Sequence, residues 1–257
     1  MIQKIRRRIG KLISGTQLKA VDPGIVDDLS PRDRAIVTRV RNYTMTSEAR
    51  LASMIASTEY VVRAQVPGAF VECGVWRGGS AMAAMLRLLE LGISDRDFYL
   101  YDTFEGMTAP TEADTSEYSP PALATWKEAE KEGGKAWDPL FNAKVFNEQD
   151  VRAALVATGY PAERMHFVKG KVEDTLPATL PKGVALLRLD TDWYESTRHE
   201  LIHLYPLVPL GGVVIIDDYG HWEGCRKAVD EYFSQPGVTP LLLNRIDYCG
   251  RVAVRVK

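Results

Sequence analysis

Sulfur and imidazole groups are scarce in this sequence. It contains three cysteines, Cys73, Cys225 and Cys249, and four histidines in 257 residues. The cysteines lie far apart and are odd in number, so neither a disulfide framework nor a Cys-x-x-Cys metal site is indicated. The simplest expectation is therefore a reduced, cytoplasmic compartment.

Long apolar runs and an excess of charge of one sign are also missing. No apolar run approaches the ~18 residues of a membrane span, so no span is expected. The N-terminus is positively charged but lacks the apolar segment and the small-residue cleavage site of a signal peptide. With 32 basic and 34 acidic residues the net charge is −2, which argues against nucleic acid as a partner.

Residues 2–13 have the pattern of a short amphipathic helix with one basic face. Two interpretations stay open: weak contact with a membrane surface or a partner, or packing against the chain's own domain or a second copy. The second is the more common role of such a helix. Pro23, Gly24 and Pro31 mark a connector after it. We therefore predict an N-terminal helical extension over residues 1–42 and one domain over residues 43–257.

Apolar runs then alternate with helical patterns at steady intervals. The alternation predicts an α/β fold with a doubly wound, mostly parallel sheet and helices on both faces. The segment 105–140 is polar and proline-rich, so a lid insertion of loop and broken helix is expected at about 108–147. A terminal antiparallel pair of strands is expected at 239–244 and 251–256. The other predicted strands are 68–74, 98–102, 165–169, 184–190 and 212–217, and the predicted helices are 32–42, 47–62, 80–91, 148–158, 194–204 and 224–233.

The first predicted strand leads into a glycine-rich turn that contains an acid. Glu72 precedes Gly74, Gly78 and Gly79. This spacing is neither Gly-x-Gly-x-x-Gly nor that of a P-loop, so a dinucleotide pyrophosphate or a triphosphate is not favoured. A carboxylate at this place repels phosphate but can hold an ammonium group, such as that of a methionine moiety. The alternative is a surface glutamate beside a structural turn.

Asp102 ends the second predicted strand, about 30 residues after Glu72. In open α/β sheets an acid at that place typically accepts hydrogen bonds from ribose hydroxyls. A nucleoside that is bound through its ribose and an amino-acid tail, without phosphates, is S-adenosylmethionine (SAM). For Asp102 alone, a role as a helix cap or a turn residue is the alternative.

Acids also gather at the ends of the fourth and fifth predicted strands. Asp190 and Asp192 end one strand, and Asp217 and Asp218 end the next. Carboxylates brought together there are costly unless a cation neutralises them. Oxygen ligands favour magnesium or calcium, and zinc is less favoured because the two motifs contain no sulfur or imidazole. A divalent ion can bind a substrate hydroxyl, lower its pKa and orient it. The alternative is that these aspartates cap the following helices.

With these residues in place, the sequence resembles the macrocin O-methyltransferase family, bacterial enzymes that methylate sugar hydroxyls of antibiotics. The resemblance implies a class I methyltransferase fold, a bound Mg²⁺ or similar ion, and a homodimer or higher oligomer. Six stretches carry it, in order along most of the chain: residues 43–47, 70–80, 101–107, 170–177, 187–197 and 211–219.

The resemblance implies that Asp190, Asp217 and Asp218 carry the metal. Asp190 or Asp192 is implied to take the proton of the acceptor hydroxyl. The sequence does not decide which of the two is the base and which is a metal ligand. One departure is Thr191, which stands where the family often has glycine. We expect its side chain to narrow the acceptor pocket.

The resemblance also assigns the cofactor. Glu72 is implied to hold the amino group of the methionine moiety of SAM, and Asp102 the ribose. The other implied cofactor-binding positions flank these acids, close over the methionine end or lie beside the adenine: Thr44, Met45, Thr46, Ser47, Gly74, Ser80, Thr103, Phe104, Gly170, Val172 and Glu173.

We therefore expect a SAM-dependent, metal-dependent O-methyltransferase that acts on a sugar hydroxyl of a glycosylated natural product or a polysaccharide. Two other functions stay open: a catechol-type phenol methyltransferase with the same metal chemistry, and a non-catalytic binding protein on the same fold. The intact acids at positions 190, 217 and 218 argue against the binding protein.

Overall fold

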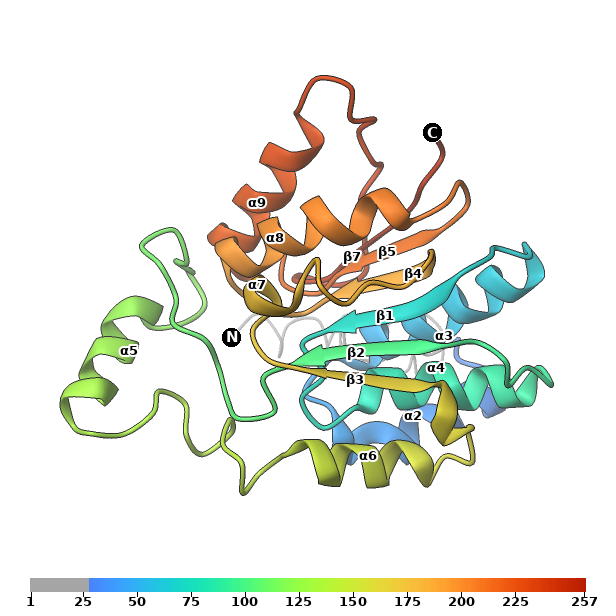
Figure 1. Ribbon diagram of the computed structural model, residues 1–257, viewed down its shortest axis with the longest axis horizontal. Helices are drawn as coiled ribbons and strands as arrows, with labels where there is room; N and C mark the ends of the chain where they lie inside the picture. Colours follow the sequence, from blue (N-terminus) through green and yellow to red (C-terminus); the bar gives the residue numbers. More distant parts are fainter. Residues whose placement is uncertain (1–27) are drawn as a thin grey trace, which may run out of the picture.

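A seven-stranded sheet forms the centre of the molecule. The computed structural model describes residues 28–257, so the helix expected at 2–13 lies outside the described residues. The strand order is β3-β2-β1-β4-β5-β7-β6, and β1 to β5 run parallel (Figure 1). β7 runs antiparallel to both β5 and β6. The strands are β1 (Ala69–Cys73), β2 (Phe98–Asp102), β3 (Met165–Lys169), β4 (Val184–Leu189), β5 (Val213–Ile216), β6 (Asn244–Arg245) and β7 (Arg251–Val254).

Helices cover both faces of the sheet. On one face lie α2 (Pro31–Val40), α3 (Glu48–Arg63), α4 (Gly79–Glu90) and α6 (Glu148–Val156). On the other face lie α7 (Val172–Thr175), α8 (Tyr194–Leu204) and α9 (Glu223–Phe233). A further helix, α5 (Ala122–Lys131), stands away from the sheet (Figure 1). Short 3₁₀ turns occupy Arg41–Tyr43, Ala162–Arg164 and Tyr205–Leu207.

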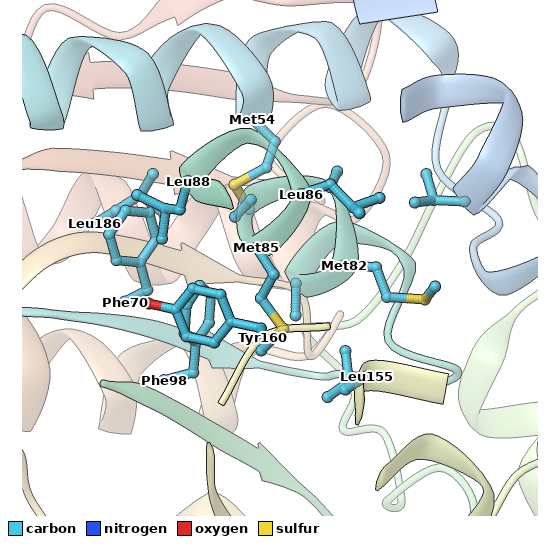
Figure 2. Close-up of a cluster of buried hydrophobic side chains, with 14 of the residues drawn as sticks. Met54, Phe70, Met82, Met85, Leu86, Leu88, Phe98, Leu155, Tyr160 and Leu186 are labelled. Atoms are coloured by element: carbon cyan, nitrogen blue, oxygen red, sulfur yellow. The ribbon is translucent and has the colours of Figure 1, made fainter. Parts of the chain in front are cut away.

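Each face of the sheet has its own hydrophobic core because side chains alternate along a strand. In β1, Phe70 packs toward α3 and α4, whereas Val71 packs toward α8. Figure 2 shows the first core, where methionines and leucines of α3 and α4 meet aromatic rings of the strands. The rings of Phe70 and Phe98 stack there with centroids 5.0 Å apart. Each fully buried side chain of this size stabilises the fold by about 1.5–3 kcal/mol.

Helix α3 begins where the sequence predicts it. The Ser47 hydroxyl accepts a hydrogen bond from the Arg50 backbone N–H at 3.1 Å, so Ser47 is the N-cap. The first turn of α3 lies at the carboxyl ends of the strands, because Arg50 in this turn pairs with Asp217 at the end of β5. The residues just before it, 44–46, are thereby held beside the same edge of the sheet.

The predicted elements agree closely with the observed ones, and the doubly wound α/β fold is confirmed. The end of the chain differs, because residues 239–243 form no strand and β6 contains only Asn244 and Arg245. The proline at 240 cannot donate a ladder hydrogen bond, and the pair with β7 is correspondingly short. Helix α2 shares the core of the domain through Ile36, Val37 and Val40. Within residues 28–257, no helix is long and apolar enough to span a membrane.

Candidate active site

The predicted acids meet where the strand order reverses, between β1 and β4. Leu189 of β4 pairs with Cys73 of β1 on one side and with Ile216 of β5 on the other. The residues that follow, Asp190 and Asp217, therefore emerge side by side at the carboxyl edge. This crevice is the usual ligand site of a doubly wound sheet.

Gly74 allows the two strand ends to approach each other. Its φ is +82°, and a Cβ at this position would lie 1.9 Å from the backbone oxygen of Asp190. A side chain at position 74 is therefore excluded by both backbone conformation and space. The glycine brings the β1 turn directly against the acidic end of β4.

Arg188 is the buried centre of the acidic cluster, and the sequence analysis did not identify it. It lies in the middle of an otherwise apolar strand, and its side chain is 4% exposed. Nη1 donates to Glu72 Oε1 at 2.6 Å and lies 2.7 Å from Asp190 Oδ2, while Nη2 donates to Asp217 Oδ1 at 2.7 Å. A buried charge must be paired, so an arginine within an apolar strand is a local sign of acidic partners that the sequence analysis did not use.

Arg50 is the second cation of the cluster and was likewise missed as a site residue. It reaches in from the first turn of α3 and pairs through Nη1 with Asp217 Oδ2. Both oxygens of Asp217 thus carry a guanidinium. Burial raises the pKa of Asp217, but Arg188 and Arg50 outweigh burial and hold it below its ordinary value.

Three of the aspartates lie close enough together to hold one ion. Asp190, Asp217 and Asp218 each offer a carboxylate oxygen, and these oxygens lie within 4.8 Å of one another. Including Glu72 and Asp192, five carboxylates gather around the guanidiniums of Arg188 and Arg50, and Arg50 also pairs with Asp247, so a further cation is electrostatically favourable. Hard oxygen ligands of this kind fit Mg²⁺. Burial also raises the pKa of both Asp190 and Asp218 well above the ordinary range.

Asp192 lies beside this triad but has different partners. Its Oδ1 accepts a hydrogen bond from Trp222 Nε1 at 2.8 Å, and its backbone N–H donates to Asp218 Oδ2 at 3.2 Å. Within residues 28–257 it forms no ion pair. Burial, followed by the charge of Asp190, raises the pKa of Asp192 to about 8.

None of these aspartates caps the helix that follows it. The N-caps of α8 and α9 are Trp193 and Trp222, neither of which makes a side-chain cap. The first turn of α8 is capped instead by Asp114 of the lid, whose Oδ1 accepts from the Tyr194 N–H at 2.7 Å. The capping alternative is therefore excluded for the pairs 190/192 and 217/218.

Asp102 joins the turns after β1 and β2. Its Oδ2 accepts from the backbone N–H groups of Val75 and Trp76, at 2.7 and 2.9 Å, and its Oδ1 from that of Phe104 at 2.7 Å. Burial raises the pKa of Asp102, and these hydrogen bonds oppose the rise. Asp102 is thus a turn residue. Both lone pairs of Oδ2 are used by the two backbone N–H groups, whereas Oδ1 accepts one short hydrogen bond and has a lone pair for a ligand hydroxyl.

A cavity of about 440 Å³ connects these groups. Glu72 lines it, and the buried Oε2 atom of this residue has no hydrogen-bond partner among residues 28–257. Ser47 and Phe104 do not line the cavity: Ser47 caps α3, and Phe104 is buried in the core. All other predicted site residues line it: Thr44, Met45, Thr46, Glu72, Gly74, Ser80, Asp102, Thr103, Gly170, Val172, Glu173, Asp190, Asp192, Asp217 and Asp218.

Hydrogen bonds connect the predicted lid, residues 108–147, to residues near the starts of α8 and α9. Trp193 Nε1 donates to the Thr108 carbonyl at 2.9 Å, and Ser119 Oγ lies 2.9 Å from His221 Nε2. Lid residues Trp137 and Phe141 line the cavity itself. The lid therefore forms the wall opposite the strand ends, where sequence patterns gave no residue assignments.

Thr191 forms a hydrogen bond with a buried acid. Its hydroxyl donates to Glu200 Oε1 at 2.9 Å, and Glu200 is fully buried on α8. Burial raises the pKa of Glu200 well above its ordinary value. Thr191 lines the cavity, so its expected effect on the acceptor pocket stays a prediction.

The fold places one cavity at the carboxyl edge of the sheet, with an acidic, metal-compatible cluster in its wall. Residues 26–255 match the family model described as Macrocin-O-methyltransferase (TylF). The chain therefore belongs to the macrocin O-methyltransferase family, and it is a SAM-dependent O-methyltransferase.

Characterised relatives are similar over most of their length. Demethyldecarbamoylnovobiocin O-methyltransferase of Streptomyces niveus is 32% identical over 86% of this chain and 82% of its own. The 8-demethyl-8-(2,3-dimethoxy-alpha-L-rhamnosyl)-tetracenomycin-C 4'-O-methyltransferase of Streptomyces olivaceus is 34% identical over 77% of this chain and 70% of its own. Among solved structures, the O-methyltransferase NovP superposes with a TM-score of 0.69 at 32% identity, covering 84% of this chain and 83% of NovP. These likenesses confirm the class I methyltransferase fold.

Proposed function

We propose that the protein transfers the methyl group of SAM to a sugar hydroxyl of a glycosylated small molecule, assisted by a divalent ion such as Mg²⁺. The observation that carries this proposal is the continuity of one cavity from Glu72 and Asp102 to the aspartate triad. The name of the Streptomyces olivaceus relative refers to a rhamnosyl-bearing tetracenomycin, which supports a glycoside acceptor. Homo-oligomer formation and a cytoplasmic location stay predictions.

Glu72 is assigned to the ammonium group of the cofactor. Its Oε1 accepts a hydrogen bond from Arg188, whereas its buried Oε2 has no partner among the described residues, and Glu72 lines the cavity. Such an atom is costly unless a ligand satisfies it. Asp102, at the end of the neighbouring strand, is assigned to the ribose, and residues 170–173 are assigned to the adenine side. Residues 44–46 are assigned to the methionine end.

Asp192 is assigned as the proton acceptor, because it is the acid beside the triad that no arginine neutralises. In the reaction the acceptor oxygen forms a bond to the methyl carbon as the carbon–sulfur bond breaks. The electron pair of that bond stays on sulfur, and the hydroxyl proton passes to the Asp192 carboxylate. An ion held by Asp190, Asp217 and Asp218 would supply Lewis acidity that lowers the pKa of the hydroxyl. The fixed positions of these side chains supply orientation.

Affinity for SAM should depend on pH through Glu72. Burial raises the pKa of this carboxyl to about 7, so it is mainly protonated at pH 5.5. The cofactor's ammonium stays charged over this range and binds the ionised carboxylate. We expect the affinity for SAM to fall about tenfold between pH 7.0 and pH 5.5, measured by calorimetry. A Glu72→Gln variant should bind weakly at both pH values, and equal wild-type affinity at both would contradict the assignment.

An acceptor screen tests the substrate class. Purified protein is incubated with SAM that carries a labelled methyl group, with Mg²⁺, and with matched glycosides and catechols. We expect label in glycosides and none in catechols. Label in catechols alone would replace the sugar hydroxyl with a phenol, and SAM binding without transfer to either class would favour a binding protein.

Removal of divalent ions tests the metal. Treatment with a chelator should lower methyl transfer by about 100-fold or more, because the hydroxyl is a poor nucleophile without Lewis-acid help. Added Mg²⁺ should restore the rate, while SAM affinity measured in parallel should change little. Undiminished transfer after complete chelation would remove the ion from the proposal.

A further inference from the structure

Arg50 links the acidic triad to the start of α3. Its side chain is 13% exposed, and its Nε donates to Asp247 Oδ2 at 3.0 Å. The same Asp247 oxygen accepts from the Ser47 hydroxyl at 2.6 Å. The other Asp247 oxygen is fixed by the backbone N–H groups of Cys249 and Gly250, at 2.8 and 2.7 Å.

Space around the Arg50 side chain is limited as well. A Cβ at Gly250 would lie 2.8 Å from Arg50 Cδ. Only glycine at position 250 therefore leaves enough space for the Arg50 side chain in its observed position. Because Asp247 holds both Arg50 and the N-cap Ser47, the guanidinium and the first turn of α3 form one unit. A displacement of the guanidinium therefore acts on residues 44–47 just before the helix.

A divalent ion bound by Asp190, Asp217 and Asp218 would share the Asp217 carboxylate with two arginines. Asp217 Oδ2 is paired with Arg50, and its Oδ1 with Arg188. Arg188 also holds Glu72 and Asp190 and lies deeper, with 4% exposure, so Arg50 is the partner that can yield. The positive charge of Arg50 would repel a dication bound to the same carboxylate, and partial burial of the pair weakens the screening of that repulsion.

We propose that Arg50 competes with the divalent ion for Asp217 and thereby couples occupancy of the triad to residues 44–47 on the cofactor side of the cavity. The inference rests on the proposed metal site, and it makes Arg50 a positioning residue rather than a catalytic one. Binding of the ion weakens the Arg50–Asp217 pair and loosens the first turn of α3. Thermodynamic linkage requires that the coupling operate in both directions.

The test measures Mn²⁺ binding to the full chain, with wild type and two variants compared by calorimetry. Arg50→Met should bind Mn²⁺ at least about tenfold more tightly than wild type, because a like charge has been removed. Arg50→Lys keeps the charge and should stay closer to wild type. Arg87→Met is the matched control, since Arg87 is similarly buried, pairs with Asp33, Glu59 and Glu90, and lies outside the cavity.

Amide hydrogen exchange of residues 44–50 supplies the second readout. In wild type, saturating Mn²⁺ should speed exchange in this segment, and in Arg50→Met the response to Mn²⁺ should disappear. Unchanged or weaker Mn²⁺ binding by Arg50→Met would overturn the competition, and a retained exchange response would overturn the coupling. Absence of Mn²⁺ binding in every protein would instead overturn the proposed metal site.

Discussion

Replacement of Arg188 by methionine should lower the free energy of unfolding by about 3–5 kcal/mol, because it leaves buried acids without their cation. Glu72, Asp190 and Asp217 all depend on this guanidinium, at 2.6, 2.7 and 2.7 Å. Methionine is also a long, unbranched side chain and adds no polar group. The loss of unfolding free energy therefore measures mainly the removal of the positive charge. Urea unfolding at neutral pH, followed by circular dichroism, measures the difference.

A surface arginine serves as the control for this variant. Arg226 pairs with Glu223 and is 38% exposed, so Arg226→Met should change stability by less than about 1 kcal/mol. An Arg188→Met protein as stable as Arg226→Met would contradict the central role given to Arg188. The double variant Glu72→Gln, Arg188→Met should recover part of the loss, because one uncompensated acid is removed.

Replacement of Asp192 by asparagine should lower kcat by about 10²–10⁴-fold while SAM affinity stays within a few-fold of wild type. Asparagine preserves the shape and can still accept from Trp222, but it cannot take the proton of the acceptor. The measurement uses the acceptor that the screen identifies, with Mg²⁺ saturating.

Asp174→Asn is the matched control, because Asp174 is an exposed acid of α7 that does not line the cavity. It should retain wild-type kcat. A fully active Asp192→Asn enzyme would transfer the role of proton acceptor to Asp190 or to solvent. A kcat loss that is accompanied by an equal loss of Mn²⁺ affinity would make Asp192 a metal ligand instead.

The fold was largely predictable because its signals are local. Strand bounds at 98–102 and 165–169 and the helix at 194–204 were predicted correctly, since apolar runs and flanking turns define them. The acids were predictable as a group because parallel strands end at one edge of the sheet. The segment 239–243 was mistaken for a strand, because its three consecutive leucines have an apolar pattern but do not pair with β7.

The residues that neutralise and cover the site were not predictable in the same way. Arg50 pairs with Asp217 across 167 positions of sequence, and Asp114 caps α8 across 80. Neither contact leaves a periodic pattern, since each depends on how a helix or lid lies over the sheet. Arg188 alone had a local signal, a charge within an apolar strand.

A crystal structure of the protein with S-adenosylhomocysteine and Mn²⁺, with anomalous scattering recorded, would locate the cofactor and the metal together. We predict an anomalous peak coordinated by Asp190, Asp217 and Asp218, with the ammonium of the ligand on Glu72 and its ribose on Asp102. A bound nucleoside without a peak at the triad, or with its ammonium away from Glu72, would show that the proposed site is wrong.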